Sequence, residues 1–218
     1  MKQLLTLGAI LLTVAVSPTH AALIGQPELI ERSIPAPAGH VVNGMLINFD
    51  GQLFGQQLLV TLTQGAIFQD PTNPGDGPPI PDPFFPVNPS LSADTYVTLG
   101  AFASSPGSSS MLVVGGSTEL GVSGPKQFDT EALNVAWAPA PGVVINGGAH
   151  FPIAQITLTN TAQGSWRLYS SSGGVGRIVS GGILNGRLYN VPEPVSLLLA
   201  GLGFAAVTVG QPRHRARL

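Results

Sequence analysis

The chain is 218 residues long with a formal charge of −2 at pH 7, and only 9% of its residues are charged. It has no cysteine, which excludes disulfide bonds and thiol chemistry, and its 28 glycines and 20 prolines favour turns over helices. Residues 22–190, which lie between two apolar ends, hold ten acidic and five basic side chains. Their formal charge of −5 argues against a nucleic-acid partner.

The first 21 residues have the layout of a secretory signal peptide. Lys2 supplies a positive start, residues 4–16 form an uncharged apolar run, and Thr19-His20-Ala21 offers small residues at the two positions that a signal peptidase reads. The run is too short for a permanent membrane span. We therefore predict export through the Sec translocon and cleavage after Ala21, with cleavage after Ala22 as the alternative.

Residues 22–190 are predicted to form one domain, because short β-branched runs separated by Gly, Pro, Asn and Ser recur throughout. This pattern predicts an all-β fold, a single antiparallel β-sandwich of immunoglobulin-like or jelly-roll type. In residues 153–159, Ala154, Ile156 and Leu158 alternate with polar residues, which predicts one buried and one solvated face. The strands are predicted at residues 40–49, 57–68, 95–102, 111–115, 133–137, 153–159, 165–170, 177–180 and 182–189.

Residues 70–89 interrupt this rhythm, because eight of the twenty are proline. We predict an extended loop or a small lid that crosses one edge of the sandwich. Calcium binds carboxylate and carbonyl oxygens in such loops, and the candidate ligands are Asp70, Asn73, Asp76 and Asp82. Their spacing does not match an EF-hand, so solvated turn acids are the favoured interpretation. No metal and no cofactor is predicted.

The predicted domain, residues 22–190, offers little for catalysis. Its only histidines, His40 and His150, follow Gly39 and Ala149 in turn-like settings, and no Gly-x-Ser-x-Gly or His-Glu-x-x-His motif occurs. We predict a protein that is not an enzyme. A secreted hydrolase is the weakest alternative, since it needs one of these histidines beside a carboxylate and a serine.

Sugar binding without cleavage is the second hypothesis, because exposed aromatic rings stack on sugars. Alternation predicts that Trp166 is in the core and that Tyr169 lies on the surface, and core packing is also favoured for Trp137. A carbohydrate-binding module would display Tyr169, Tyr96 or a tryptophan, with residues 70–89 at the rim of the site.

The last 28 residues have three parts in a fixed order. The box Val191-Pro192-Glu193-Pro194 precedes an uncharged run at residues 195–210 and a basic tail at residues 211–218. A helix of sixteen residues would span roughly 24 Å, which makes a marginal transmembrane anchor. Positive charge after the run favours a cytoplasmic tail, and it comes from Arg213, Arg215 and Arg217.

This arrangement resembles the PEP-CTERM sorting signal of exported proteins of Gram-negative bacteria. The resemblance implies that residues 195–210 hold the precursor in the inner membrane and that the membrane protease exosortase processes it near Pro192, Glu193 and Pro194. It also implies a mature protein in the cell envelope or extracellular matrix, associated with exopolysaccharide or biofilm. The three domains predicted are thus residues 1–21, 22–190 and 191–218.

Overall fold

The computed structural model describes residues 23–73, 75–79, 86–116, 118–122 and 124–191. The short helices of this part are η1 (Pro89–Ala93), α1 (Pro106–Ser109) and η2 (Thr118–Leu120). Its strands are β1 (Leu23–Glu31), β2 (His40–Gln64), β3 (Tyr96–Val97), β4 (Met111–Val114), β5 (Gln127–Phe128), β6 (Ala132–Pro139), β7 (Asn146–Thr159), β8 (Gln163–Ser172), β9 (Val175–Leu184) and β10 (Arg187–Asn190).

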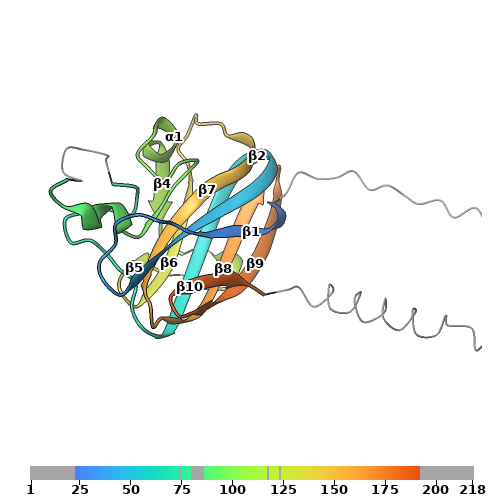
Figure 1. The fold of residues 1–218 in the computed structure, drawn as a ribbon. Helices are drawn as coiled ribbons and strands as arrows, with labels where there is room; N and C mark the ends of the chain where they lie inside the picture. The colour runs from blue at the N-terminus through green and yellow to red at the C-terminus, as the bar shows by residue number, and fades with distance from the viewer. Residues whose placement is uncertain (1–22, 74, 80–85, 117, 123, 192–218) are drawn as a thin grey trace, which may run out of the picture.

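Strand β2 organises the fold because it takes part in both halves of the sheet (Figure 1). Its first half pairs with β1 and β7, and its second half pairs with β8 and β6, all antiparallel. The longest path through the sheet runs β10-β9-β8-β2-β6-β4. The predicted antiparallel all-β fold is confirmed. A sandwich of two separate sheets is not, because the 25 residues of β2 join the halves into one curled sheet.

The middle of β2 allows this curl. Its register against β7 shifts between Phe49 and Gln52, and its register against β8 shifts between Leu53 and Gly55. Gly51 lies within the first of these irregularities with a φ of 69°, a conformation that residues with a Cβ rarely adopt. Bulges of this kind bend a strand and increase its twist. The sequence suggested two strands here, at residues 40–49 and 57–68, where the structure has one.

The concave side of the sheet encloses the core. Leu58 and Val60 of β2 are fully buried, whereas Thr61 and Thr63, which follow on the opposite face of the strand, are exposed. Both tryptophans lie in this core, Trp137 with 1% and Trp166 with 0% of its surface exposed. The predicted core position of Trp166 is therefore confirmed, and so is the favoured one of Trp137.

Strand β7 differs from its prediction of one solvated face. Gln155 and Thr157 are as buried as Ile156 and Leu158, because the segment before β3 covers them. The Gln155 amide donates to the carbonyl oxygens of Ser92 and Asp94 at 2.9 and 2.7 Å. A segment from elsewhere in the chain thus closes the face that the alternation left open to water.

Other predictions fail at strand boundaries or lie outside the described residues. The predicted strand at residues 95–102 shrinks to Tyr96–Val97, and β1 and β5 were not predicted. In the described part of the chain, no helix has the length and apolar character needed to cross a membrane. The predicted signal peptide, the transmembrane run at residues 195–210 and the basic tail lie beyond the described residues.

Candidate functional site

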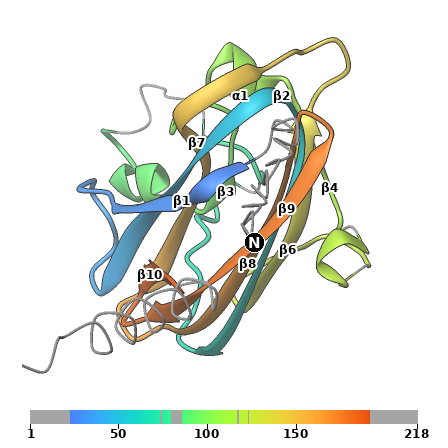
Figure 2. The same ribbon diagram turned by 90° about the vertical axis from the view of Figure 1, so that its right-hand side faces the viewer.

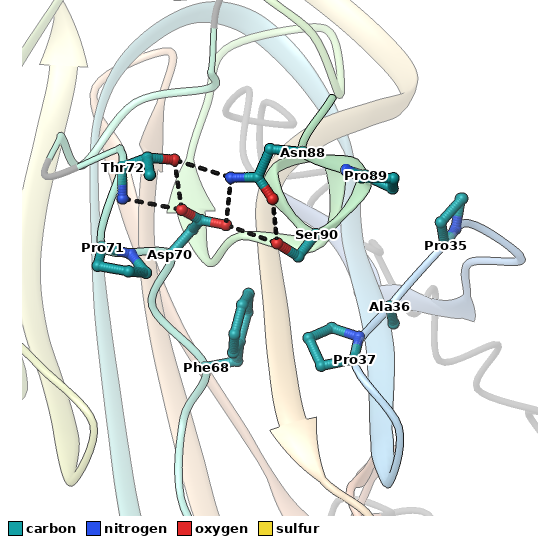
Figure 3. A pocket seen from close by; sticks show the side chains of 10 residues that line it. All are labelled: Pro35, Ala36, Pro37, Phe68, Asp70, Pro71, Thr72, Asn88, Pro89 and Ser90. Atoms are coloured by element: carbon teal, nitrogen blue, oxygen red, sulfur yellow. Dashed lines mark hydrogen bonds between the residues drawn. The ribbon is translucent and has the colours of Figure 1, made fainter. Parts of the chain in front are cut away.

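A pocket of about 450 Å³ lies between three segments that are distant in the sequence (Figure 3). One wall is apolar and comes from residues 35–37 and the ring of Phe68. The other wall is polar and comes from the two ends of the proline-rich loop, with Asp70, Pro71 and Thr72 at one end and Asn88, Pro89 and Ser90 at the other. An apolar wall that faces convergent polar groups is typical of small-molecule sites.

The carboxylate of Asp70 ties the two ends of the loop together. Its Oδ1 accepts hydrogen bonds from the Thr72 backbone N–H at 2.8 Å and from the Thr72 hydroxyl at 2.5 Å. Its Oδ2 accepts hydrogen bonds from the Ser90 hydroxyl at 2.9 Å and from the Asn88 amide at 3.4 Å. Asp70 has only 2% of its surface exposed, so the expectation that it is a solvated turn acid is wrong.

A second carboxylate, Asp94, lies behind the first and is fully buried. Its Oδ1 accepts the backbone N–H of Asp70 at 2.8 Å and that of Thr95 at 2.9 Å, while its Oδ2 accepts the Asn73 amide at 2.7 Å. Asp94 therefore links the start of the loop to β3. We call Asp70, Asp94 and their side-chain donors Thr72, Asn73, Asn88 and Ser90 the loop clamp.

The pKa values of the two carboxyl groups of the loop clamp are shifted in opposite directions. Burial alone would raise the pKa of Asp70, but hydrogen bonds from Thr72, Ser90 and Asn88 outweigh it and lower that pKa below its usual value. Burial raises the pKa of Asp94 to about 6, although its own hydrogen bonds oppose the shift, and the charge of Asp70 adds to the rise. At neutral pH both groups are ionised, and Asp94 is the one that takes up a proton first on acidification.

A smaller hollow of about 290 Å³ borders the loop clamp and includes Asn73, Asp76 and Asp129 in its lining. Asp76 is paired there with Lys126, so one of the candidate calcium ligands already has a cationic partner. Within the described ranges, no group of three or more His, Asp or Glu side chains is arranged to hold a metal ion. Asp82, another member of that set, lies outside the described residues.

Among the described residues, neither histidine is hydrogen-bonded to a carboxylate of the loop clamp. The His40 ring contacts the Phe68 ring edge-on, and its Nδ1 lies 3.2 Å from the Ala38 carbonyl oxygen. His150 pairs with Glu28 at an exposed site. In the region that the structure describes, neither histidine is hydrogen-bonded to a serine hydroxyl. The three-part arrangement that a serine hydrolase needs is therefore not assembled among these groups.

The aromatic residues of the sugar-binding hypothesis are mostly inaccessible. Besides the two tryptophans, Tyr96 is buried, with 1% of its surface exposed, and its hydroxyl donates to the Phe102 carbonyl oxygen at 3.0 Å. The prediction that Tyr96 or a tryptophan is displayed at the surface is thus wrong. Tyr169 is partly exposed, as predicted, and its ring lies over Gly176 beside a shallow apolar groove that includes Leu112 and Val114.

Comparison of the chain with family models finds no match, and comparison with curated proteins also finds none. The interpretation of the pocket therefore depends on its own geometry. Asp94, Asn88 and Ser90 were not singled out in the sequence. Only Asp70 with Thr72 carried a recognisable signal, since an Asp commonly accepts a hydrogen bond from the backbone two residues on.

Proposed function

We propose that the chain is an exported protein of the cell envelope or extracellular matrix, that it is not an enzyme, and that exosortase processes it near Pro192, Glu193 and Pro194. The precursor is held in the inner membrane by residues 195–210, with Arg213, Arg215 and Arg217 on the cytoplasmic side. The mature domain associates with exopolysaccharide. This assignment depends on the resemblance of residues 191–218 to a PEP-CTERM signal.

One structural observation carries the proposal. Strand β10 ends at Asn190, and Val191, the first residue of the box, is already 48% exposed. The box therefore follows the last strand directly and begins at the surface of the domain. A protease needs such an accessible segment, and Pro192 and Pro194 disfavour its inclusion in a regular helix.

Alanine substitution of the box tests this proposal. In the native cells, the variant with Pro192, Glu193 and Pro194 replaced by alanine should remain in the membrane fraction as an unprocessed precursor. The control Glu131→Ala, which removes an exposed acid elsewhere, should be processed like the natural chain. Normal processing of the box variant would contradict the proposal.

A carbohydrate-binding module is the second candidate, and the two-sided pocket favours it. Sugars present apolar ring faces and polar edges, which suit Phe68 on one wall and Asn88 on the other. A glycan array with the full chain would test this function. Loss of binding in Asn88→Ala but not in Tyr169→Ala would assign the pocket, the reverse would assign the groove beside Tyr169, and no binding to any glycan would contradict the candidate.

A further inference from the structure

The domain begins and ends on one side. The start of β1 and the end of β10 both lie on the right-hand side of Figure 1, which faces the viewer in Figure 2. The Asn190 amide donates a hydrogen bond of 2.9 Å to the Pro27 carbonyl oxygen of β1. The last strand is thus fixed against the first close to the point where the chain leaves the domain.

Exposed apolar side chains lie near the start of β1 and near the end of β10. Ile24 of β1 is 57% exposed, Tyr189 of β10 is 47% exposed, and Val191 is 48% exposed. The Tyr189 ring lies over Gly182 of β9, where a Cβ would come within 2.1 Å of the tyrosine hydroxyl oxygen. We call these three residues the exit patch. Tyrosine beside aliphatic side chains is common at the membrane–water interface.

The distance between the domain and the apolar run is short. Five residue steps separate Asn190 from Val195, which span at most about 17 Å when fully extended. The headgroup layer occupies about 6 Å of that length, since a bilayer of about 42 Å has a hydrocarbon core of about 30 Å. About 11 Å then remains between the membrane surface and the end of β10.

This length is smaller than the radius of the domain. A domain of this size has a radius of gyration of roughly 15 Å and is about 40 Å across. Turning it by a right angle would place the end of β10 about 20 Å from the membrane surface, beyond the reach of the connection. Only orientations in which the exit side faces the bilayer are therefore compatible with the chain.

We propose that, while residues 195–210 lie in a membrane, the exit patch of Ile24, Tyr189 and Val191 rests on the phospholipid interface. This inference depends on the anchoring that the proposed function assigns to residues 195–210. Arg187, two residues before Tyr189, pairs with Glu31 at 2.9 Å, and Arg177 donates a hydrogen bond to the Leu23 carbonyl oxygen at 3.1 Å, so both cations near the patch have partners in the domain. Contact with the bilayer is then mainly apolar, and we expect it in neutral as well as anionic vesicles.

Site-specific labels can test the orientation, because the chain has no cysteine. Full-length Ile24→Cys and Tyr189→Cys are each labelled with a fluorophore and reconstituted into phosphatidylcholine vesicles that contain a lipid with a nitroxide headgroup. Leu112→Cys is the matched control, because Leu112 is 52% exposed on β4, which Figure 1 places away from the exit side. Fluorescence of the buried Trp137 and Trp166 reports that each variant is folded.

We expect several-fold stronger quenching at positions 24 and 189 than at position 112. Equal quenching at all three positions, or the strongest quenching at 112, in chains that float with the vesicles would overturn this inference alone. A chain that does not float with the vesicles would overturn the proposed anchoring and this inference together. The two failures are therefore distinguishable.

Discussion

Two buried polar clusters of this domain differ in how their hydrogen bonds are satisfied. In the loop clamp, the carboxylates of Asp70 and Asp94 accept seven hydrogen bonds from the chain. A second cluster lies between β2 and β8, where Gln56 and Ser170 are cross-strand neighbours and Ser172 is next on the same face. The side-chain polar atoms of these three residues have no partner within the described residues.

The difference indicates how each cluster affects the stability of the domain. A buried charge without partners is far more costly than a buried hydroxyl or amide, so the charged groups lie where the loop supplies donors. The strand cluster is neutral, and the sheet around it is fixed by backbone hydrogen bonds that do not depend on it. We therefore expect the hydrogen bonds to Asp70 to stabilise the domain at pH 7 and the strand cluster to destabilise it slightly.

The largest effect is expected for Asp70→Ala. The substitution removes the hydrogen bonds that the backbone N–H and hydroxyl of Thr72 and the hydroxyl of Ser90 donate to the carboxylate, and a hydrogen bond to a charged group contributes about 1.5–3 kcal/mol. The free energy of unfolding at pH 7, measured by urea denaturation, should fall by about 3–4 kcal/mol. Asp50→Ala, at an exposed position, should change it by less than about 1 kcal/mol. Equal losses in both variants would remove the special role of the loop clamp.

The next effect is a dependence on pH that Asp94 controls. Its pKa is about 6 in the folded domain against 3.8 for an ordinary Asp, so folding takes up a proton between these values and stability rises as the pH falls through this window. At pH 7 the buried charge costs about 3 kcal/mol relative to the protonated group. Asp70 acts oppositely, since its pKa is lowered and its contribution is lost only as the pH falls below 3.8.

The unfolding free energy should therefore rise as the pH falls from 7 and be greatest near pH 4. In Asp94→Asn, the side-chain oxygen still accepts from Asp70 and Thr95, and the Asn73 amide can turn its oxygen toward the new amide. This variant should be about 2 kcal/mol more stable at pH 7 and nearly independent of pH between 4 and 7. Denaturation at a series of pH values measures both. An unchanged slope in the variant would contradict the role of Asp94.

A smaller loss of stability is expected for Ser90→Ala. Ser90→Ala removes one donor of Asp70 and should lower the free energy of unfolding by about 1–2 kcal/mol at pH 7. The pKa of Asp70 should rise in this variant, because one of the hydrogen bonds that lower it is lost. NMR titration of the Asp70 carboxyl carbon measures that shift. A pKa that stays constant would show that Ser90 does not hold the carboxylate.

The smallest effect has the opposite sign. Ser170→Ala removes a buried hydroxyl without a partner and should raise the free energy of unfolding by about 1 kcal/mol. Thermal denaturation of Ser170→Ala and Ser90→Ala under the same conditions compares the two clusters directly. A loss of stability in Ser170→Ala would show that a bound water molecule satisfies the strand cluster and that the contrast between the clusters is wrong.

The two clusters also show which features the sequence predicts. Alternation placed Ile156, Leu158 and Trp166 in the core, because the period of a strand is local. It could not place Asp94, because the groups that Asp94 binds, at residues 70 and 73, lie more than twenty residues earlier in the chain. It also made Gln155 a solvated residue, since the segment that covers β7 is close only in three dimensions.

For the tail of the chain, the order of residues in the sequence is more informative than the structure. The box at Val191 and Pro192, the uncharged run and the arginines are recognised from their order alone, and almost all of them lie beyond the described residues. Within the fold, β10 ends next to the box and leaves Val191 exposed, a detail that no residue pattern predicts. The sequence thus suggests the destination of the chain, and the structure supplies the geometry of its connection.

The proposed export and processing are tested most directly by the intact mass of the protein purified from the envelope of its native cells. We predict a chain that begins at Ala22 and ends near the Pro192-Glu193-Pro194 box, without residues 195–218. A mass that still includes Arg213, Arg215 and Arg217 would contradict the account.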